Sequence, residues 1–404
     1  MAVSTELASF RLFSGMLDRQ RLIRYWGALL AIELFASLFF VAGTYGLIVP
    51  LAKPATTDSV SFYAAGALAG AETPQLAYDE AQHYAAEERA TEAGIDYNFF
   101  YYPPIFILVC AALARLPYVA AFLLFETTTL AAYLLVARAI LDKPDPVIAF
   151  PAVFWNFGFG QNAFLTAALF GAGTLYIDRR PVVAGLLFGA LCYKPQFGLL
   201  IPVALAAGGH WRAFAAAFAS ASVLSLLSLA AFGWETWHNF LTAASASSAV
   251  YESGRIRLSG YINLFGAVRH LGGSPGLAYA MQAGAIVAAA AFVACVWRGG
   301  FSLPIRAASL ASAALVAAPL ALFYDLVLGE LAVLWLFRAG ADNRVTDWEK
   351  IALAGLFVLS LTPRSLAEFS HLPIGVFIPL VVAALIVLRV FRCTLGAPMR
   401  LEAA

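Results

Sequence analysis

Asp58 is the acidic residue whose position best suits a general base. It lies in the segment PATTDSVSFYAAGALAG, directly before a predicted helix and nine residues after Val49. An aspartate before a helix is most often an N-cap, and spacing alone favours that role. The two roles are compatible, because a carboxylate at a helix start near a membrane surface is also well placed to accept a proton from a hydroxyl group.

Lys194 is the strongest sign of a buried cation. It is the only lysine between Lys143 and Lys350, and it lies between two apolar runs in FGALCYKPQFGLLIPV, just before Pro195. A buried ammonium group needs an anionic partner, and a phosphate would serve, with Gln196 as a further donor. The alternative is that Lys194 only extends its ammonium group to the membrane surface.

Two neighbouring amides and a late Tyr–Asp pair are further candidates. Gln161 and Asn162 begin an apolar run in WNFGFGQNAFLTAALF, where helix capping and ligand binding are about equally compatible with the sequence. Unpaired amides at membrane depth are costly. Tyr324 and Asp325 lie in APLALFYDLVLGELA, and an acid inside a membrane segment is a functional hypothesis by default. From sequence alone, Asp325 and the other intramembrane acids show no shared site.

Aromatic and basic residues complete the candidate site. Five aromatic residues, Tyr101 and Tyr102 among them, precede a double proline in GIDYNFFYYPPIFILV, and Tyr63 belongs to the helix predicted after Asp58. A single ring at such a place is most often part of an interfacial belt, but a cluster could form a wall for a sugar or an isoprenoid chain. Arg257 lies in a long basic loop. Basic residues on an external loop run against the positive-inside rule, so Arg257, like Arg255 of the same loop, is expected to face a lipid phosphate.

The composition fixes the class of protein that must position these residues. Of 404 residues, 62% are hydrophobic and 12% are charged, and the net charge is +1; the mean hydropathy is +0.81. These values exclude a soluble enzyme, a disordered protein and a nucleic-acid binder. About 250 apolar residues could supply up to about twelve membrane spans. The four cysteines form no CxxC pair and have no histidine at ligand spacing, so neither a disulfide framework nor a metal site is expected.

The predicted organisation is an all-α bundle of about twelve membrane helices with one large external loop. Residues 1–25 form a cytoplasmic tail with four arginines, 26–391 the membrane domain, and 392–404 a second cytoplasmic tail. The first span is Trp26 to Val49, and the loop 51–102 is expected to carry helices lying on the membrane. One of the runs 103–115 and 147–157 is expected not to cross. The short runs within 181–208 are expected to be broken or re-entrant helices.

The ordered motifs resemble a known family. The motifs follow one another in the order TDSVSFYAAGALAG, LAYD, FFYYPPIFILVCAALARLP, GFGQNAFLTAALF, DRRP, GLLFGALCYKPQFGLLIPVAL and HWRAFA, and the resemblance covers about residues 26 to 340. This pattern is similar to glycosyltransferase family 87, whose members resemble polyprenol-phosphate-mannose-dependent α-mannosyltransferases of the GT-C superfamily. The resemblance implies a GT-C-like bundle with an external active site and Asp58 as catalytic base. It maps the KPQ element onto Lys194 to Gln196 and the amide pair onto Gln161 and Asn162.

The expected function follows from the residues and the resemblance together. A hexose, with mannose favoured, is transferred with inversion from a polyprenyl phosphate sugar to a hydroxyl group of a glycolipid, polysaccharide or protein. Lys194, Gln196 and Arg257 are expected to hold the donor phosphate, and neither a metal nor another cofactor is expected. The location is the plasma (inner) membrane with the site facing outward. A transporter or lipid-linked sugar flippase is the alternative, and a structural membrane scaffold is a third possibility. An external cavity with Asp58 on its wall would favour the enzyme, whereas a site at the membrane midplane would favour transport.

Overall fold

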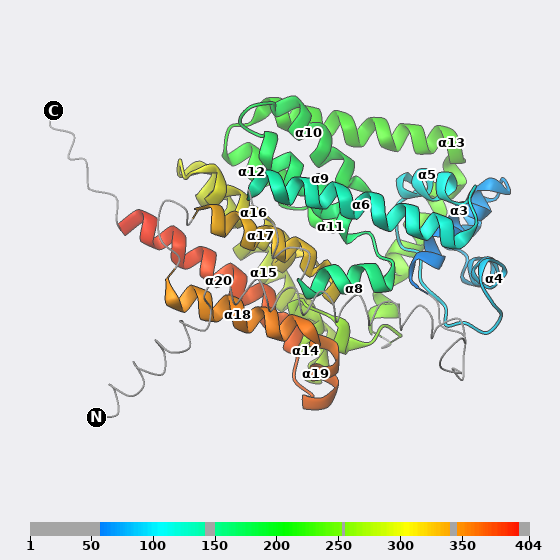
Figure 1. Ribbon diagram of the computed structural model, residues 1–404. Coiled ribbons are helices and arrows are strands. Elements are labelled where there is room, and N and C mark those ends of the chain that lie inside the picture. Colours follow the sequence, from blue (N-terminus) through cyan, green and yellow to red (C-terminus); the bar gives the residue numbers. More distant parts are fainter. Residues whose placement is uncertain (1–56, 142–149, 253–254, 340–345, 396–404) are drawn as a thin grey trace.

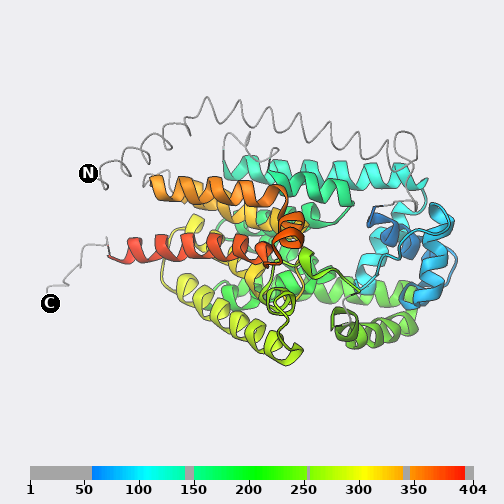
Figure 2. The ribbon, with the colours of Figure 1, turned by 90° about the horizontal axis from the view of Figure 1, so that it is seen from below.

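The structure is a computed structural model, and it describes residues 57–141, 150–252, 255–339 and 346–395. The predicted N-terminal tail and first span, Trp26 to Val49, lie outside these residues, as does most of the predicted C-terminal tail. Every named element of the described part is a helix, and a single isolated bridge joins Tyr261 to Leu322. The helices run side by side along the molecule, with α3 and α4 gathered at one end (Figures 1 and 2).

Three short helices form that end. They are α3 (Ser59–Gly70), η1 (Pro74–Tyr78) and α4 (Glu80–Ala90). Helix α3 packs against α4 on one side and against α5 (Pro104–Leu113) on the other. The α3–α5 approach requires a glycine, because a Cβ atom at Gly66 would lie 2.1 Å from the carbonyl oxygen of Cys110. This close packing fixes the helix that begins next to Asp58.

Four helices of the described residues are long and apolar enough to cross a membrane. They are α6 (Tyr118–Ile140), α13 (Trp211–Glu252, kinked at Gly233), α15 (Pro275–Arg298) and α20 (Ile374–Leu395). A fifth is added if α18 (Asp347–Leu361) and α19 (Pro363–Ser370), which meet at 79°, count as one broken span. The protein therefore has the helices of a membrane protein, but the expected twelve spans are not confirmed.

Further apolar helices of the described residues are shorter than a straight span. Five other apolar helices have only 10–17 residues, which is about 15–26 Å of helix against a hydrocarbon core of about 30 Å. The run 103–115 contains α5 with 10 residues, and 147–157 overlaps α8 (Pro151–Phe159) with nine. Both are too short for a straight span, as their lengths in the sequence suggested.

Three breaks between apolar helices lie around the core. The first separates α8 from α9 (Ala163–Tyr176), where Gly160 takes a left-handed conformation with φ 66°. The second falls at Lys194, which confirms that the runs within 181–208 form broken helices. The third precedes Leu326 at the start of α17. The elements flanking the last two breaks are α10 (Pro181–Ala190), η2 (Leu191–Tyr193), α11 (Pro195–Gly198), α12 (Ile201–Ala207), α16 (Leu303–Ala317), η4 (Phe323–Asp325) and α17 (Leu326–Ala339).

Helices α16 and α17, which follow one another in the chain and pack together, form the centre of the bundle. Most side chains of both helices are buried, and the helices pack against α9, α15 and α20. The remaining elements, η3 (Leu258–Gly260) and α14 (Leu264–His270), link α13 to α15. Because the core helices end at the breaks, the backbone and polar side chains of the breaks are held in fixed positions next to α3.

Candidate active site

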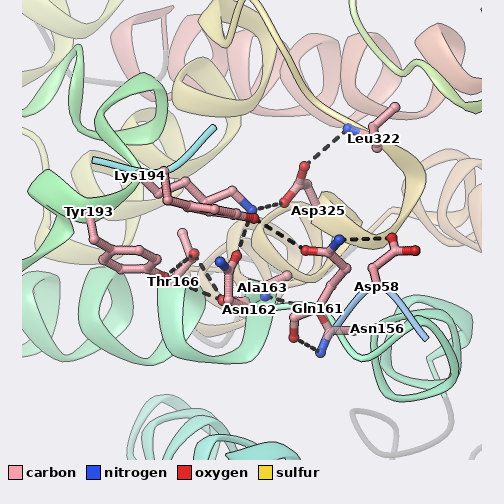
Figure 3. A network of polar contacts seen from close by, with 11 residues as sticks. Asp58, Asn156, Gln161, Asn162, Ala163, Thr166, Tyr193, Lys194, Leu322 and Asp325 are labelled. Carbon is pink, nitrogen blue, oxygen red and sulfur yellow. Dashed lines mark hydrogen bonds and ion pairs between the residues drawn. The ribbon is translucent and has the colours of Figure 1, made fainter. Parts of the chain in front are cut away.

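A cavity of about 700 Å³ lies where the three helix breaks meet α3. Each break contributes polar side chains to its wall, and the rest of the wall comes from the aromatic segment 97–103, from α13 and from Arg255. Its polar lining includes Asp58, Gln161, Lys194, Gln196, Tyr324 and Asp325. Figure 3 shows how the central polar residues face one another across the breaks.

Asp58 precedes α3, but its side chain does not cap that helix. Its backbone has helical angles (φ −60°, ψ −17°), and among the described residues its side chain makes no capping hydrogen bond. Instead Oδ2 accepts a hydrogen bond of 2.8 Å from Gln161 Nε2, and the Asp58 amide donates to the Phe159 carbonyl oxygen at 2.8 Å. The N-cap role favoured by spacing is therefore wrong for the side chain.

The environment of Asp58 favours a stronger base than an ordinary aspartate. Burial raises the pKa of its carboxyl group to about 6, against opposing effects from the Gln161 hydrogen bond and from the positive charge of Arg364. Burial disfavours the charged form of a carboxyl group, and a neutral amide compensates only in part. A carboxyl group with a pKa close to neutral is suited to proton transfer at physiological pH.

The amide pair lies in the first break, and Asn156 organises the break. Asn156 Nδ2 donates to the Gln161 carbonyl oxygen at 2.8 Å, and its Oδ1 accepts from the Ala163 amide at 2.9 Å. Asn162, at the N-cap position of α9, makes no side-chain capping bond there. Asn156 therefore does the capping, and Gln161 and Asn162 are free to turn toward Asp58 and Lys194. Asn156 is not among the site residues predicted from the sequence.

Lys194 is buried and already has an anionic partner in the protein. Its Nζ lies 2.7 Å from Asp325 Oδ1 and 3.0 Å from Asn162 Oδ1, and the side chain is 4% exposed. The rings of Phe197 and Tyr324 lie 5.1 and 5.7 Å from the ammonium nitrogen. The alternative in which Lys194 extends to the membrane surface is therefore wrong. Asp325 is therefore not an isolated acid, because it shares a site with Lys194.

The comparison with known families decides the class of protein. Residues 100–322, more than half of the chain, match the profile of glycosyltransferase family 87. The chain belongs to glycosyltransferase family 87. No curated protein and no solved structure matches it. The matched residues include the amide pair and Lys194, whereas Asp58 and Asp325 lie outside them.

The aromatic residues of this family 87 glycosyltransferase divide into two groups. Tyr101 and Tyr102 line the cavity, and the Tyr102 hydroxyl donates to Gln161 Oε1 at 3.3 Å. Tyr63 lies elsewhere, because its hydroxyl donates to the Leu116 carbonyl oxygen at 2.9 Å and it does not line the cavity. The predicted aromatic wall thus forms from the 97–103 segment and not from the exposed side of α3.

The basic loop contributes Arg255 to the cavity in place of the expected Arg257. Arg257 is 74% exposed and lies 3.8 Å from Glu368, outside the cavity lining. A bend at residues 255–256 separates the two side chains. Arg255 lines the cavity, its guanidinium carbon 4.7 Å from the centre of the Phe99 ring, and it binds Glu80 through contacts of 2.6 and 3.0 Å.

A buried pair on α4 holds the aromatic segment in place. Glu87 Oε2 accepts a hydrogen bond of 3.1 Å from the Asn98 amide, and His83 Nε2 donates to the Ser61 carbonyl oxygen at 3.1 Å. Burial raises the pKa of Glu87 to about 8 and lowers the pKa of His83 to about 4, so both are neutral at pH 7. The His-x-x-x-Glu spacing in α4 was the available sequence signal, since residues four apart share a helix face.

Proposed function

We propose that this family 87 glycosyltransferase moves a hexose, with mannose favoured, from a polyprenyl phosphate sugar to an acceptor hydroxyl group in the 700 Å³ cavity. The observation that carries the proposal is Asp58, a partly buried carboxylate on the cavity wall whose hydrogen-bond partner is a neutral amide. A carboxylate so placed keeps its capacity to accept a proton from the acceptor.

The reaction balances with the groups at hand. The acceptor oxygen forms a bond to the anomeric carbon as the bond from that carbon to the phosphate oxygen breaks. The electron pair leaves with the polyprenyl phosphate, and Asp58 takes the proton of the acceptor hydroxyl group. A single in-line displacement inverts the anomeric centre. The donor carries its own leaving group, so the reaction as written needs no further cofactor.

Two cations on the cavity wall are suited to the negative charge of the departing phosphate. Lys194 has three N–H donors. Among the described residues, Asp325 and Asn162 accept hydrogen bonds from two of them, so the third can donate to a ligand. Arg255 lies farther along the wall in an ion pair that is open to solvent. Gln196 lines the same cavity and can add a neutral donor. We assign the expected role of Arg257 to Arg255.

The direction of the helices supports a cavity facing the outside of the plasma membrane. Helix α9 starts at the cavity and is followed by Arg179 and Arg180, and α17 starts at Asp325 and carries Arg338 in its last turn. In α16 the order is reversed, with Arg306 near the end remote from the cavity. Basic residues collect on the cytoplasmic side of membrane proteins, so the opposite, cavity-bearing end is assigned to the outside.

A transporter or lipid-linked sugar flippase is the second candidate, favoured by the three broken helices around the site. Discontinuous helices are typical of transporter binding sites. In this chain, however, the breaks face a wall formed by the segment 97–103, which the short polar helix α4 holds at one end of the bundle (Figure 1). That placement supports the enzyme.

The test is transfer by the purified protein in lipid. We expect labelled polyprenyl phosphate mannose, incubated with a membrane extract, to yield a glycosylated product, whereas Asp58→Asn, which keeps the size of the side chain, yields on the order of 10²–10⁴-fold less. Melting curves of the two proteins should coincide. Turnover of Asp58→Asn within a few fold of the parent would rule out Asp58 as the base. Movement of the labelled lipid between leaflets without a product would favour the flippase.

A further inference from the structure

A second hollow lies behind the wall that carries Asp58. It has a volume of about 250 Å³ and lies between α8, η4 and α19. Its lining includes the rings of Trp155, Phe159 and Phe323 together with Arg364 and Glu368 of α19. Neither the expected site nor the proposed donor cavity includes any of these residues.

The first and third helix breaks form the wall between the small hollow and the large cavity. In the first break Phe159 lines the small hollow while Gln161 lines the large cavity, and in the third Phe323 lines the small hollow while Tyr324 lines the large cavity. Asp58 is anchored to this wall, because its amide donates to the Phe159 carbonyl oxygen at 2.8 Å. The Asp58 backbone is thus hydrogen-bonded to a residue of the small hollow, whereas its carboxylate lines the large cavity.

Arg364 lines the small hollow and acts on Asp58 through its charge. Its positive charge is near enough to lower the pKa of the Asp58 carboxyl group against the effect of burial. The large cavity thus contributes the hydrogen-bond partner of Asp58, Gln161, and the small hollow contributes a charge that acts on it.

The lining of the small hollow has the chemistry that a saccharide requires. The ring of Phe323 meets those of Trp155 and Phe159 edge-on at 5.6 and 5.1 Å, which leaves apolar ring surface for the C–H groups of a sugar. Arg364 Nε lies 3.2 Å from Glu368 Oε1. A guanidinium group donates and a carboxylate accepts, so together they can satisfy both functions of sugar hydroxyl groups.

The polar pair is also free enough to exchange partners. Arg364 and Glu368 are 33% and 46% exposed, and an exposed ion pair contributes little to stability. The opposite face of α19 is apolar, with Phe369 89% exposed. A helix with one apolar and one charged face lies at a membrane surface, where the head group of a lipid-linked acceptor would be found.

In-line displacement requires the acceptor to approach the anomeric carbon from the side opposite the leaving phosphate. With the donor phosphate held by the cations of the large cavity, the acceptor hydroxyl group must lie on the side of the anomeric carbon that faces Asp58, which belongs to the wall next to the small hollow. We propose that the hollow between α8, η4 and α19 binds a saccharide unit of the acceptor, so that the acceptor is a glycan. This inference rests on the proposed function, because it takes Asp58 as the base and the large cavity as the donor site.

The test compares two arginines that contact the same carboxylate. Arg364 lines the hollow, whereas Arg257, 3.8 Å from Glu368, does not. Octyl glycosides of mannose, glucose and galactose serve as acceptors with polyprenyl phosphate mannose as donor, and the methyl glycosides are the lipid-free counterparts. We expect Arg364→Gln and Glu368→Gln to raise the acceptor KM about tenfold or more with an unchanged donor KM, while Arg257→Gln stays within twofold of the parent.

A charge-preserving variant separates binding from the effect on Asp58. Arg364→Lys keeps the charge near Asp58 but loses the planar fork. It should keep the pH profile of the parent and still raise the acceptor KM. Equal changes in donor and acceptor KM, an unchanged acceptor KM in both hollow variants, or the same rise in Arg257→Gln would overturn the inference. Octyl and methyl glycosides with equal KM would assign the site to the sugar alone, whereas a lower KM for octyl glycosides would assign it to a glycolipid head group.

Binding without turnover distinguishes failure of this inference from failure of the proposed function. Labelled octyl glycosides are measured by equilibrium dialysis against Asp58→Asn, with and without Arg364→Gln. Binding that Arg364→Gln abolishes, in a protein whose parent transfers no sugar, would keep the saccharide site and remove the transferase. Product formation by a parent whose octyl glycoside binding is insensitive to Arg364→Gln would keep the transferase and remove the hollow as its acceptor site.

Discussion

Asp58 and the Lys194–Asp325 pair are two arrangements of buried charge on the wall of one cavity, and they differ in what surrounds the charge. Lys194 has an aspartate at 2.7 Å, an amide at 3.0 Å and two aromatic rings within 6 Å. Among the described residues, Asp58 has one neutral amide side chain at 2.8 Å. In the pair, each charge offsets the cost of burying the other. At Asp58 that cost persists and raises the proton affinity of the carboxylate.

This difference in surroundings gives the two charged groups different roles, one in stability and one in the reaction. A buried pair whose partners are both present is neutral as a unit, and it fixes the second and third helix breaks relative to each other. A carboxylate without a cation at hydrogen-bond distance is less stable and more basic, which is what proton transfer needs. One wall therefore carries a charge that holds the site together and a charge that is left reactive.

Breaking the pair should have the largest effect on stability. Lys194→Met leaves Asp325 as an uncompensated buried charge, so we expect a loss of about 3–5 kcal/mol in the free energy of unfolding. The double variant Lys194→Met/Asp325→Leu removes both charges and should recover most of that loss. Thermal unfolding in detergent measures both. A single variant as stable as the parent would show that the pair does not hold the breaks together.

The exposed pair Arg255–Glu80 sharpens the comparison, because it should be free to exchange Glu80 for a ligand. Arg255→Gln removes a charged hydrogen-bond donor, and such bonds contribute about 1.5–3 kcal/mol, so the donor KM should rise about 10- to 150-fold. Glu80→Gln frees Arg255 and should leave the donor KM unchanged or lower it. Arg257→Gln is the matched control outside the cavity.

These variants also test the opposite role for Arg255. If the ion pair only braces the cavity wall, Glu80→Gln and Arg255→Gln break the same contact and should raise the donor KM alike. That result would remove Arg255 from the donor site.

The smallest and most specific expected effect is a pH dependence of the activity, which the proton affinity of Asp58 determines. Asp58 can act as a base only when it is unprotonated, and burial raises its pKa to about 6. Activity should therefore be full above that pH, and kcat/KM should fall tenfold per pH unit below it. Gln161→Leu removes the hydrogen bond that lowers this pKa, so the midpoint should move to higher pH. Rates measured from pH 4.5 to 8 check both. A profile that is flat through pH 6 would show that Asp58 does not titrate in the reaction.

Local sequence was enough to find the polar residues but not their partners. Asp58, Gln161 and Lys194 each interrupt or adjoin an apolar run, and that contrast is visible in the sequence. The contact between Lys194 and Asp325 joins residues 131 positions apart, and no periodicity connects them. The choice of Arg255 over Arg257 depends on a bend that neither residue type predicts.

The count of twelve spans is not confirmed among the described residues, for a related reason. Composition counts apolar residues, but it does not show where a helix stops. Gly160, with its left-handed backbone, and Pro195 divide apolar stretches into pieces shorter than a membrane. The same divisions expose the backbone and the polar side chains from which the cavity is made.

The distance along the chain between Lys194 and Asp325 also has a consequence during synthesis. At about 5–20 residues per second, the ribosome needs roughly 7–26 s to make the 131 residues that separate them. During that interval Lys194 has no aspartate and must stay hydrated, because an isolated ammonium group in hydrocarbon is costly. The second helix break therefore reaches its final depth only after α17 has emerged, which makes the cavity one of the last parts of the nascent protein to assemble.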